Sequence, residues 1–130
     1  MTDQEDEKWF SLSPSGMQIS DRNNYSTKIT PTSVSSSVFY ASSDKRLKTN
    51  ITPYKCEKSI LDLPVYEFDY IKTNQHTIGC LAQDLQEICP QIVIQKEDGY
   101  LSINENKLIY LLLEEVKELK REIQGLKELI

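Results

Sequence analysis

Residues 42–48, Ser-Ser-Asp-Lys-Arg-Leu-Lys, contain the side chains of this 130-residue chain best suited to catalysis. They provide two hydroxyls, one carboxylate and three bases within seven positions. A serine hydroxyl becomes a useful nucleophile when a nearby base takes its proton. A lysine can serve as that base once its pKa falls from about 10.4 to about 7–8, as burial or a neighbouring positive charge can cause. The segment is therefore either a Ser–Lys catalytic site or an ordinary solvated loop.

Ser43 and Lys48 form the candidate pair within this segment. Their spacing of five, without any apolar period around them, predicts a turn or an extended loop that folds the lysine back onto the hydroxyl. Asp44 and Arg46 are candidates to orient the segment or to stabilise developing oxyanion charge. Without further evidence, a solvated loop remains the simpler interpretation of this composition.

The overall composition limits the classes of function. A chain of this length predicts one domain, with or without a flexible arm. A net charge of -5, with lysines interleaved among glutamates, argues against a nucleic-acid partner. The sequence contains no apolar run of membrane-spanning length and no signal peptide at its start, so no membrane partner is expected.

The cysteines and the histidine argue against a metal site. Cys56, Cys80 and Cys89 make an odd count without a CxxC motif, and the chain has only one histidine, His76. A zinc site and a disulfide framework are both disfavoured, which indicates a reducing compartment. We expect no metal and no cofactor, and we interpret His76 as a turn or strand-end residue because no carboxylate partner is evident.

The sequence divides at residue 42 into two parts of different character. Residues 1–42 are rich in serine and threonine; their acidic start, 1–8, predicts disorder, and alternating patterns predict short strands at 17–20, 27–30 and 35–40. Such a segment cannot fill a core alone. It is either the end of a β-rich module completed elsewhere or a spacer arm.

Residues 43–103 predict a small α+β domain of short strands and helices. Periodicity and breaker residues place a short helix at 59–63, a half-buried strand at 65–71, a buried apolar run at 77–82, an amphipathic helix at 83–88, and a hairpin turning at 97–99.

Residues 104–130 predict one long helix, with Asn104 able to cap it and an oligomerisation seam along it. The apolar steps alternate between three and four residues, which is the a/d pattern of a coiled coil, with β-branched residues at a and leucine at d. The seam consists of Ile109, Leu112, Val116, Leu119, Ile123, Leu126 and Ile130. The alternative is a surface helix folded against its own domain.

The flanks of the seam favour a parallel homo-oligomer but leave its number open. Glu115 and Glu122 at g each precede a lysine at e by five residues, Lys120 or Lys127, and would face it across a parallel interface. The residue types at a and d favour two strands, whereas additional leucines at e and g suit a larger bundle.

Residues 43–130 also resemble a known family. Ser43-Asp44-x-Arg46-Leu47-Lys48 resembles the cleavage motif of the intramolecular chaperone domain (peptidase S74 type) at the C-terminus of phage endosialidases, tail spikes and neck appendage proteins. This domain is similar to the self-cleaving region of animal myelin regulatory factor. Three further motifs follow in order: Ile51-Thr52-Pro53 with the strand at 65–70, the "IGxxAQ(E/D)" signature at 78–84 with Pro90 after it, and the closing helix within 100–119.

The resemblance implies a domain that forms a homotrimer through a parallel helical bundle and templates a β-rich shaft at its N-terminus. It then cuts itself off. From the composition, no nucleic-acid or membrane partner is expected. Carried onto this chain, Ser43 is the nucleophile, Lys48 its base, and the bond between Ser42 and Ser43 is cut once. Ser42 is a poorer nucleophile because a leucine stands five residues after it. Residues 1–42 would be the end of the shaft.

The implied location is the host cytoplasm during phage assembly, with the N-terminal product in the virion tail. Two alternatives remain: a trimerisation tip that never cuts, and a plain coiled-coil structural module of a viral fibre. A relative of myelin regulatory factor is disfavoured because residues 1–42 lack basic DNA-binding character.

Overall fold

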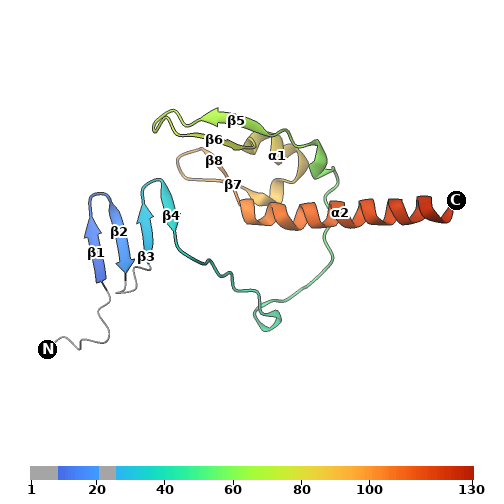
Figure 1. The fold of residues 1–130 in the computed structure, drawn as a ribbon, viewed down its shortest axis with the longest axis horizontal. Coiled ribbons are helices and arrows are strands. Elements are labelled where there is room, and N and C mark those ends of the chain that lie inside the picture. Colours follow the sequence, from blue (N-terminus) through green and yellow to red (C-terminus); the bar gives the residue numbers. More distant parts are fainter. Residues whose placement is uncertain (1–8, 21–25) are drawn as a thin grey trace. The chain divides into compact units, whose positions relative to one another are not determined.

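A computed structural model describes residues 9–20 and 26–130 (Figure 1). The predicted disorder of residues 1–8 lies outside these ranges. The chain forms two compact units, residues 1–51 and 52–130, which are described separately. The division predicted at 42/43 is the predicted position of a cut, and the compactness of the two units does not test it.

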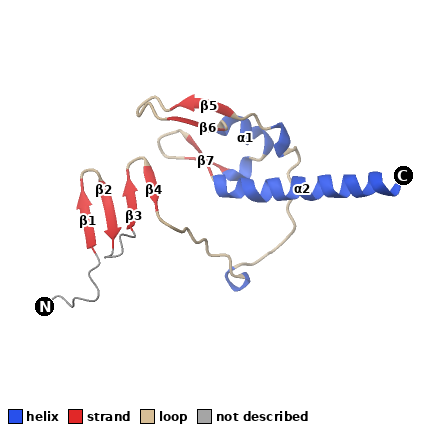
Figure 2. Cartoon of the chain, in the orientation of Figure 1, coloured by secondary structure: helices blue, strands red, loops and turns tan. Residues whose placement is uncertain are grey.

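The first unit contains a four-stranded antiparallel sheet in the order β1-β2-β3-β4 (Figure 2). Its strands are β1 (Trp9–Ser13), β2 (Gly16–Ser20), β3 (Ser26–Thr30) and β4 (Ser33–Ser35). The strands predicted at 17–20 and 27–30 are confirmed. The one predicted at 35–40 is wrong, because a tight turn after Thr30 starts β4 at once and backbone pairing with β3 ends at Ser35.

One face of this sheet is apolar and uncovered within the described part of the unit. Directly paired residues share a face, which brings the large apolar side chains of all four strands together. Leu12 is 77% exposed, and Val34 is 57% exposed. The residues of this apolar sheet face are Phe10, Leu12, Met17, Ile19, Ile29 and Val34.

The second unit contains two hairpins and two helices. One hairpin pairs β5 (Tyr66–Asp69) with β6 (His76–Gly79), and the other pairs β7 (Val93–Gln95) with β8 (Leu101–Ile103). The helices are α1 (Ala82–Ile88) and α2 (Glu105–Glu128). Short 3-10 turns lie at Ile60–Asp62 (η2) and Pro90–Ile92 (η3). These elements confirm the α+β prediction with its long C-terminal helix, whereas the trimeric bundle stays a prediction.

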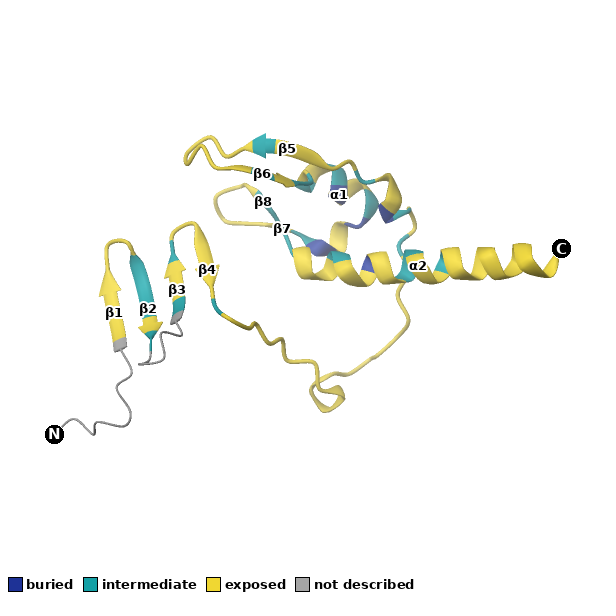
Figure 3. Cartoon of the chain, in the orientation of Figure 1, coloured by how far each residue is buried: buried dark blue, intermediate teal, exposed yellow. Residues whose placement is uncertain are grey.

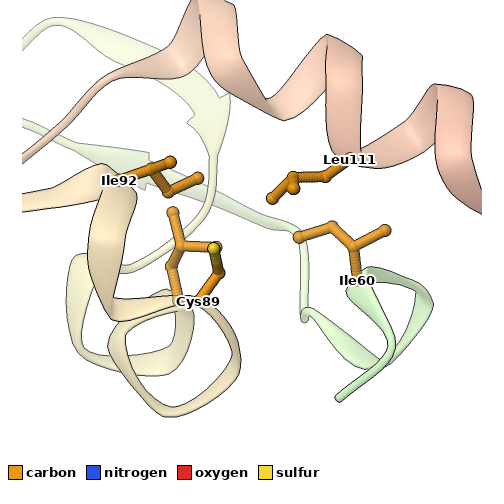
Figure 4. Close-up of a cluster of buried hydrophobic side chains, with 5 residues drawn as sticks. Ile60, Cys89, Ile92 and Leu111 are labelled. Carbon is orange, nitrogen blue, oxygen red and sulfur yellow. The ribbon is translucent and has the colours of Figure 1, made fainter. Parts of the chain in front are cut away.

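The core of the chain, as far as the structure describes it, lies in this second unit (Figure 3). Leu111 from α2 and Ile60 from η2 point toward each other, beside Cys89 and Ile92 (Figure 4). Leu85 of α1 completes the cluster and is fully buried. Asn104 donates its N–H to the carbonyl of Ile92 at 3.0 Å, which ties the start of α2 to this core.

Three local expectations differ from the structure. Asn104 precedes α2, but its side chain makes no capping hydrogen bond. The helix ends at Glu128 rather than at residue 130. The run at 77–82 is not uniformly buried, because Ile78 on β6 is 69% exposed.

No described helix combines the length and apolar character needed to cross a membrane.

Candidate functional site

Residues 42–48 fold as a short reversal built around a 3-10 turn, Lys45–Leu47 (η1). Leu47 N–H donates to the Asp44 carbonyl at 3.0 Å, and Lys48 N–H donates to the Lys45 carbonyl at 3.1 Å. The residues on both sides, Asp44 and Lys48, have extended backbone angles. The predicted turn is therefore confirmed, and it brings the chain after the turn back toward the chain before it.

Asp44 holds this turn together. Its Oδ1 accepts the backbone N–H of Arg46 at 2.8 Å, the usual way in which an aspartate caps the first turn of a helix. The Arg46 guanidinium donates to the same carboxylate, with Nη2 lying 2.8 Å from Oδ2. The Arg46 side-chain hydrogen bonds, and secondarily its backbone N–H, lower the pKa of Asp44 below the usual 3.8. Both predicted supporting residues thus contact each other.

Ser43 and Lys48 meet across the turn. The Nζ of Lys48 donates to the Oγ of Ser43 at 2.6 Å, a short hydrogen bond between residues five apart in sequence. A candidate base must reach the proton that it removes within about 2.6–3.2 Å, and this contact meets that requirement. The structure therefore brings together the two residues that the sequence singled out.

The site is open to solvent in the single chain. All residues from 41 to 55 are exposed, and Leu47 next to the lysine is 74% exposed. The burial that would help a lysine to act as a base is therefore not provided by residues 41–55 themselves. A catalytic lysine at this site would need cover from groups outside residues 41–55.

The predicted oligomerisation residues form an exposed apolar row along α2, with Ile130 just beyond the end of the helix. Their exposed fractions range from 44% at Leu119 to 104% at Ile130. The helix packs on its own unit through a neighbouring face that includes Leu111, which is 7% exposed, and the partly buried Leu108. The helix therefore packs on its own unit through one face, and oligomerisation through the exposed row stays a prediction. The exposed row is Ile109, Leu112, Val116, Leu119, Ile123, Leu126 and Ile130.

Glu115 has a partner that the sequence did not reveal. Its Oε1 accepts the Ser59 hydroxyl at 2.8 Å and the Ile60 N–H at 3.2 Å, which ties α2 to η2. The predicted contact of Glu115 with a lysine of another chain therefore competes with an internal role. Glu122 and Lys127 remain exposed.

One other polar contact, between His76 and Asp69, was missed. His76 Nδ1 lies 2.7 Å from Asp69 Oδ1 across the β5–β6 hairpin, so the expectation that it lacks a carboxylate partner is wrong. The signal that could have revealed this pair is a β-hairpin in which Asp69 and His76 stand opposite each other on the two strands. The pair is exposed on both sides, with side-chain exposures of 62% and 66%.

Within the described ranges, no three histidine, cysteine, aspartate or glutamate side chains cluster as metal ligands.

Comparison with known proteins identifies one family. Residues 43–94 match the family model Peptidase S74, described as chaperone of endosialidase. The match begins at Ser43 and includes the Ser43–Lys48 turn, β5, β6, α1 and β7 up to Ile94. Neither the curated proteins nor the solved structures searched gave a match. Residues 43–94 are therefore similar to the chaperone-of-endosialidase family.

Proposed function

We propose that residues 43–130 are an intramolecular chaperone that forms a parallel homotrimer and assists folding of a β-rich phage tail spike or neck appendage. It then releases itself by cutting the chain between Ser42 and Ser43. The observation that carries the cutting step is the 2.6 Å contact between Lys48 Nζ and Ser43 Oγ. The family match supports the chaperone role.

The cut proceeds through an ester. Ser43 Oγ attacks the carbonyl carbon of Ser42 while neutral Lys48 takes the hydroxyl proton. The resulting five-membered ring collapses by breaking the bond to the Ser43 nitrogen, which receives the proton from Lys48. The Ser42 acyl group now sits on Ser43 Oγ. Water hydrolyses this ester, leaving a carboxylate on Ser42 and a free amino group on Ser43.

Assembly supplies what the single chain lacks. The isolated turn is exposed, and water favours an ammonium over the neutral amine that the reaction needs. Three copies associated through the exposed row of α2 would bury apolar surface and bring further groups over the turn. Cutting would then follow assembly, so that release reports a folded trimer.

The first unit supports the proposal that residues 1–42 end a shaft. Its sheet presents an apolar face that no described residue of the unit covers, and this face needs another layer to be stable in water. Equivalent sheets in the other two chains are suitable partners. We place assembly in the host cytoplasm and the N-terminal product in the virion tail.

The test is intact-mass analysis of the purified 130-residue chain, with a denaturing gel alongside. We expect two fragments, residues 1–42 and residues 43–130. Ser43→Ala and Lys48→Ala should each leave the chain whole while oligomers still form. Ser42→Ala is the matched control, since it changes the neighbouring hydroxyl but keeps the scissile carbonyl, and it should still be cut. A wild-type chain that stays whole in its assembled state contradicts the cutting step.

The second candidate is a trimerisation tip that chaperones but stays attached. The full exposure of the turn in the single chain favours it, because a solvated lysine is a poor base. In that case the wild type and the Ser43→Ala variant would both stay whole, with intact masses that differ only by the oxygen atom removed, and would have the same oligomeric state.

A further inference from the structure

Two cysteines and a tyrosine meet at the edge of the core in residues 52–130. The Tyr54 hydroxyl lies 3.1 Å from Cys89 Sγ, and Cys56 Sγ donates to the same hydroxyl oxygen at 3.7 Å. The Tyr54 hydroxyl also donates to Gln91 Oε1. Both sulfur atoms therefore lie around a single phenol oxygen, although the two cysteines are far apart in sequence.

The two sulfur atoms belong to different parts of the unit. Cys89 follows α1 and is 1% exposed, within the core cluster shown in Figure 4. Cys56 lies in the segment before η2, is partly buried and packs against the same cluster. A link between them would join the start of the unit to the end of α1.

Small molecules can approach this cluster from the surface. A pocket of about 310 Å³ is lined by Tyr54, Cys89 and Gln91 together with Lys107 and Tyr110 of α2. A smaller cavity of about 60 Å³ is lined by Tyr54 and Cys56 together with Glu115. Each thiol thus borders a cavity, which a reagent needs in order to reach it.

We propose that Cys56 and Cys89 are a modification site for small-molecule disulfides and close into a reversible disulfide with each other. The thiolate of one cysteine attacks the reagent disulfide, forms a mixed disulfide and releases one thiol. The thiolate of the second cysteine then attacks the protein sulfur and releases the second thiol. The protein loses two hydrogen atoms, and the reagent is reduced to two thiols.

The surroundings of Cys56 determine the rate of this exchange. Burial is the main cause that raises the pKa of Cys56, with smaller contributions from Cys89 and Glu115, while the Tyr54 hydroxyl lowers it. The thiolate is the attacking species, so exchange is slow at neutral pH and accelerates as the pH rises. In a reducing compartment the pair remains as thiols, and an oxidising environment closes it.

The closed form should be more stable than the open form. A disulfide restricts the unfolded chain, and the loop between residues 56 and 89 is long enough for that effect to be substantial. For a unit of this size we expect the thermal midpoint to rise by at least about 5 °C. The rise should reverse when the disulfide is reduced.

The test uses the 130-residue chain with Cys80→Ser, which leaves only the two cysteines of the cluster. After incubation with oxidised glutathione at about pH 8, near the usual thiol pKa, the intact mass should fall by two hydrogen atoms. A non-reducing peptide map should join the peptides of Cys56 and Cys89. The matched controls are Cys80→Ser/Cys56→Ser and Cys80→Ser/Cys89→Ser, which should show no internal link.

Other outcomes overturn the proposal. Glutathione attached to either cysteine without an internal link would show that the sulfur atoms cannot reach each other. Two free thiols after prolonged incubation would show that the reagent does not modify this site. Both cysteines lie in residues 43–130, so the result is the same whether or not the chain is cut at Ser43. The two proposals can therefore fail independently.

Discussion

Lys48 Nζ lies 2.6 Å from Ser43 Oγ, across a 3-10 turn of three residues. The turn is held by Asp44, which accepts both the backbone N–H and the guanidinium of Arg46. The hydroxyl and the amine are therefore positioned by local contacts, before any assembly. Under the proposed function, assembly would add the removal of water from this contact.

Lys48→Arg tests whether the lysine acts as a base. Arginine keeps the positive charge and can donate to Ser43, but its guanidinium does not lose a proton in proteins. Cutting should therefore slow by at least about 100-fold, the lower range for loss of a general base. The measurement is the fraction of cut chain over time by intact mass.

Lys45→Arg is the control for this experiment, because it makes the same exchange at another lysine of the same turn. It should cut at the wild-type rate. If Lys48→Arg also cuts at that rate, the contact with Ser43 is structural and Lys48 is not the base.

Acid should open the turn only below the usual range of an aspartate. Hydrogen bonds from Arg46 lower the pKa of Asp44, so the ionised carboxylate favours the turn above about pH 3.8. This contribution is lost as the pH falls through the lowered pKa of the folded turn. An NMR titration of the Asp44 carboxyl should give a midpoint below 3.8, and Arg46→Ala should move it upward. An unchanged midpoint in Arg46→Ala would show that the ion pair does not persist in solution.

Ile123→Lys should weaken assembly and leave the single chain folded. Ile123 is 54% exposed and lies within the apolar row, so a lysine there costs little in the monomer but would be buried and unpaired in a bundle. We expect assembly to weaken by at least about tenfold, an effect of about 1.4 kcal/mol. Light scattering coupled to size exclusion measures it.

Gln124→Lys is the matched control, since it adds the same charge on the next residue of α2, outside the row. It should assemble as the wild type does. Equal assembly of Ile123→Lys and Gln124→Lys would count against the row as the interface.

Glu115→Ala should destabilise the second unit. It removes the acceptor for the Ser59 hydroxyl and for the backbone N–H of Ile60. Ile60 is only 5% exposed. Leaving such a donor without a partner costs about 1–3 kcal/mol, measurable by urea unfolding. Glu122→Ala, on an exposed part of the same helix, should change stability by less than about 0.5 kcal/mol. Equal losses in both variants would mean that the tie to η2 contributes nothing.

Much of the fold follows from patterns within a few residues. The alternation at 65–71 became β5, the Glu97-Asp98-Gly99 turn became a hairpin with Gly99 at φ 86°, and the run after Asn104 became α2. These succeed because period, turn residues and helix ends act locally. The strand predicted at 35–40 failed because its length depended on pairing with β3.

The sequence by itself determined the candidate pair, Ser43 and Lys48, the apolar row of α2 and the short elements between them, because spacing and residue type are local properties. Only the tertiary structure decided which face of α2 packs inward at Leu111, and that Glu115 binds Ser59. It alone brought Cys56 and Cys89 around Tyr54 and left the Ser43 turn exposed. Such contacts join segments that are distant in the chain, and their burial depends on how whole elements pack.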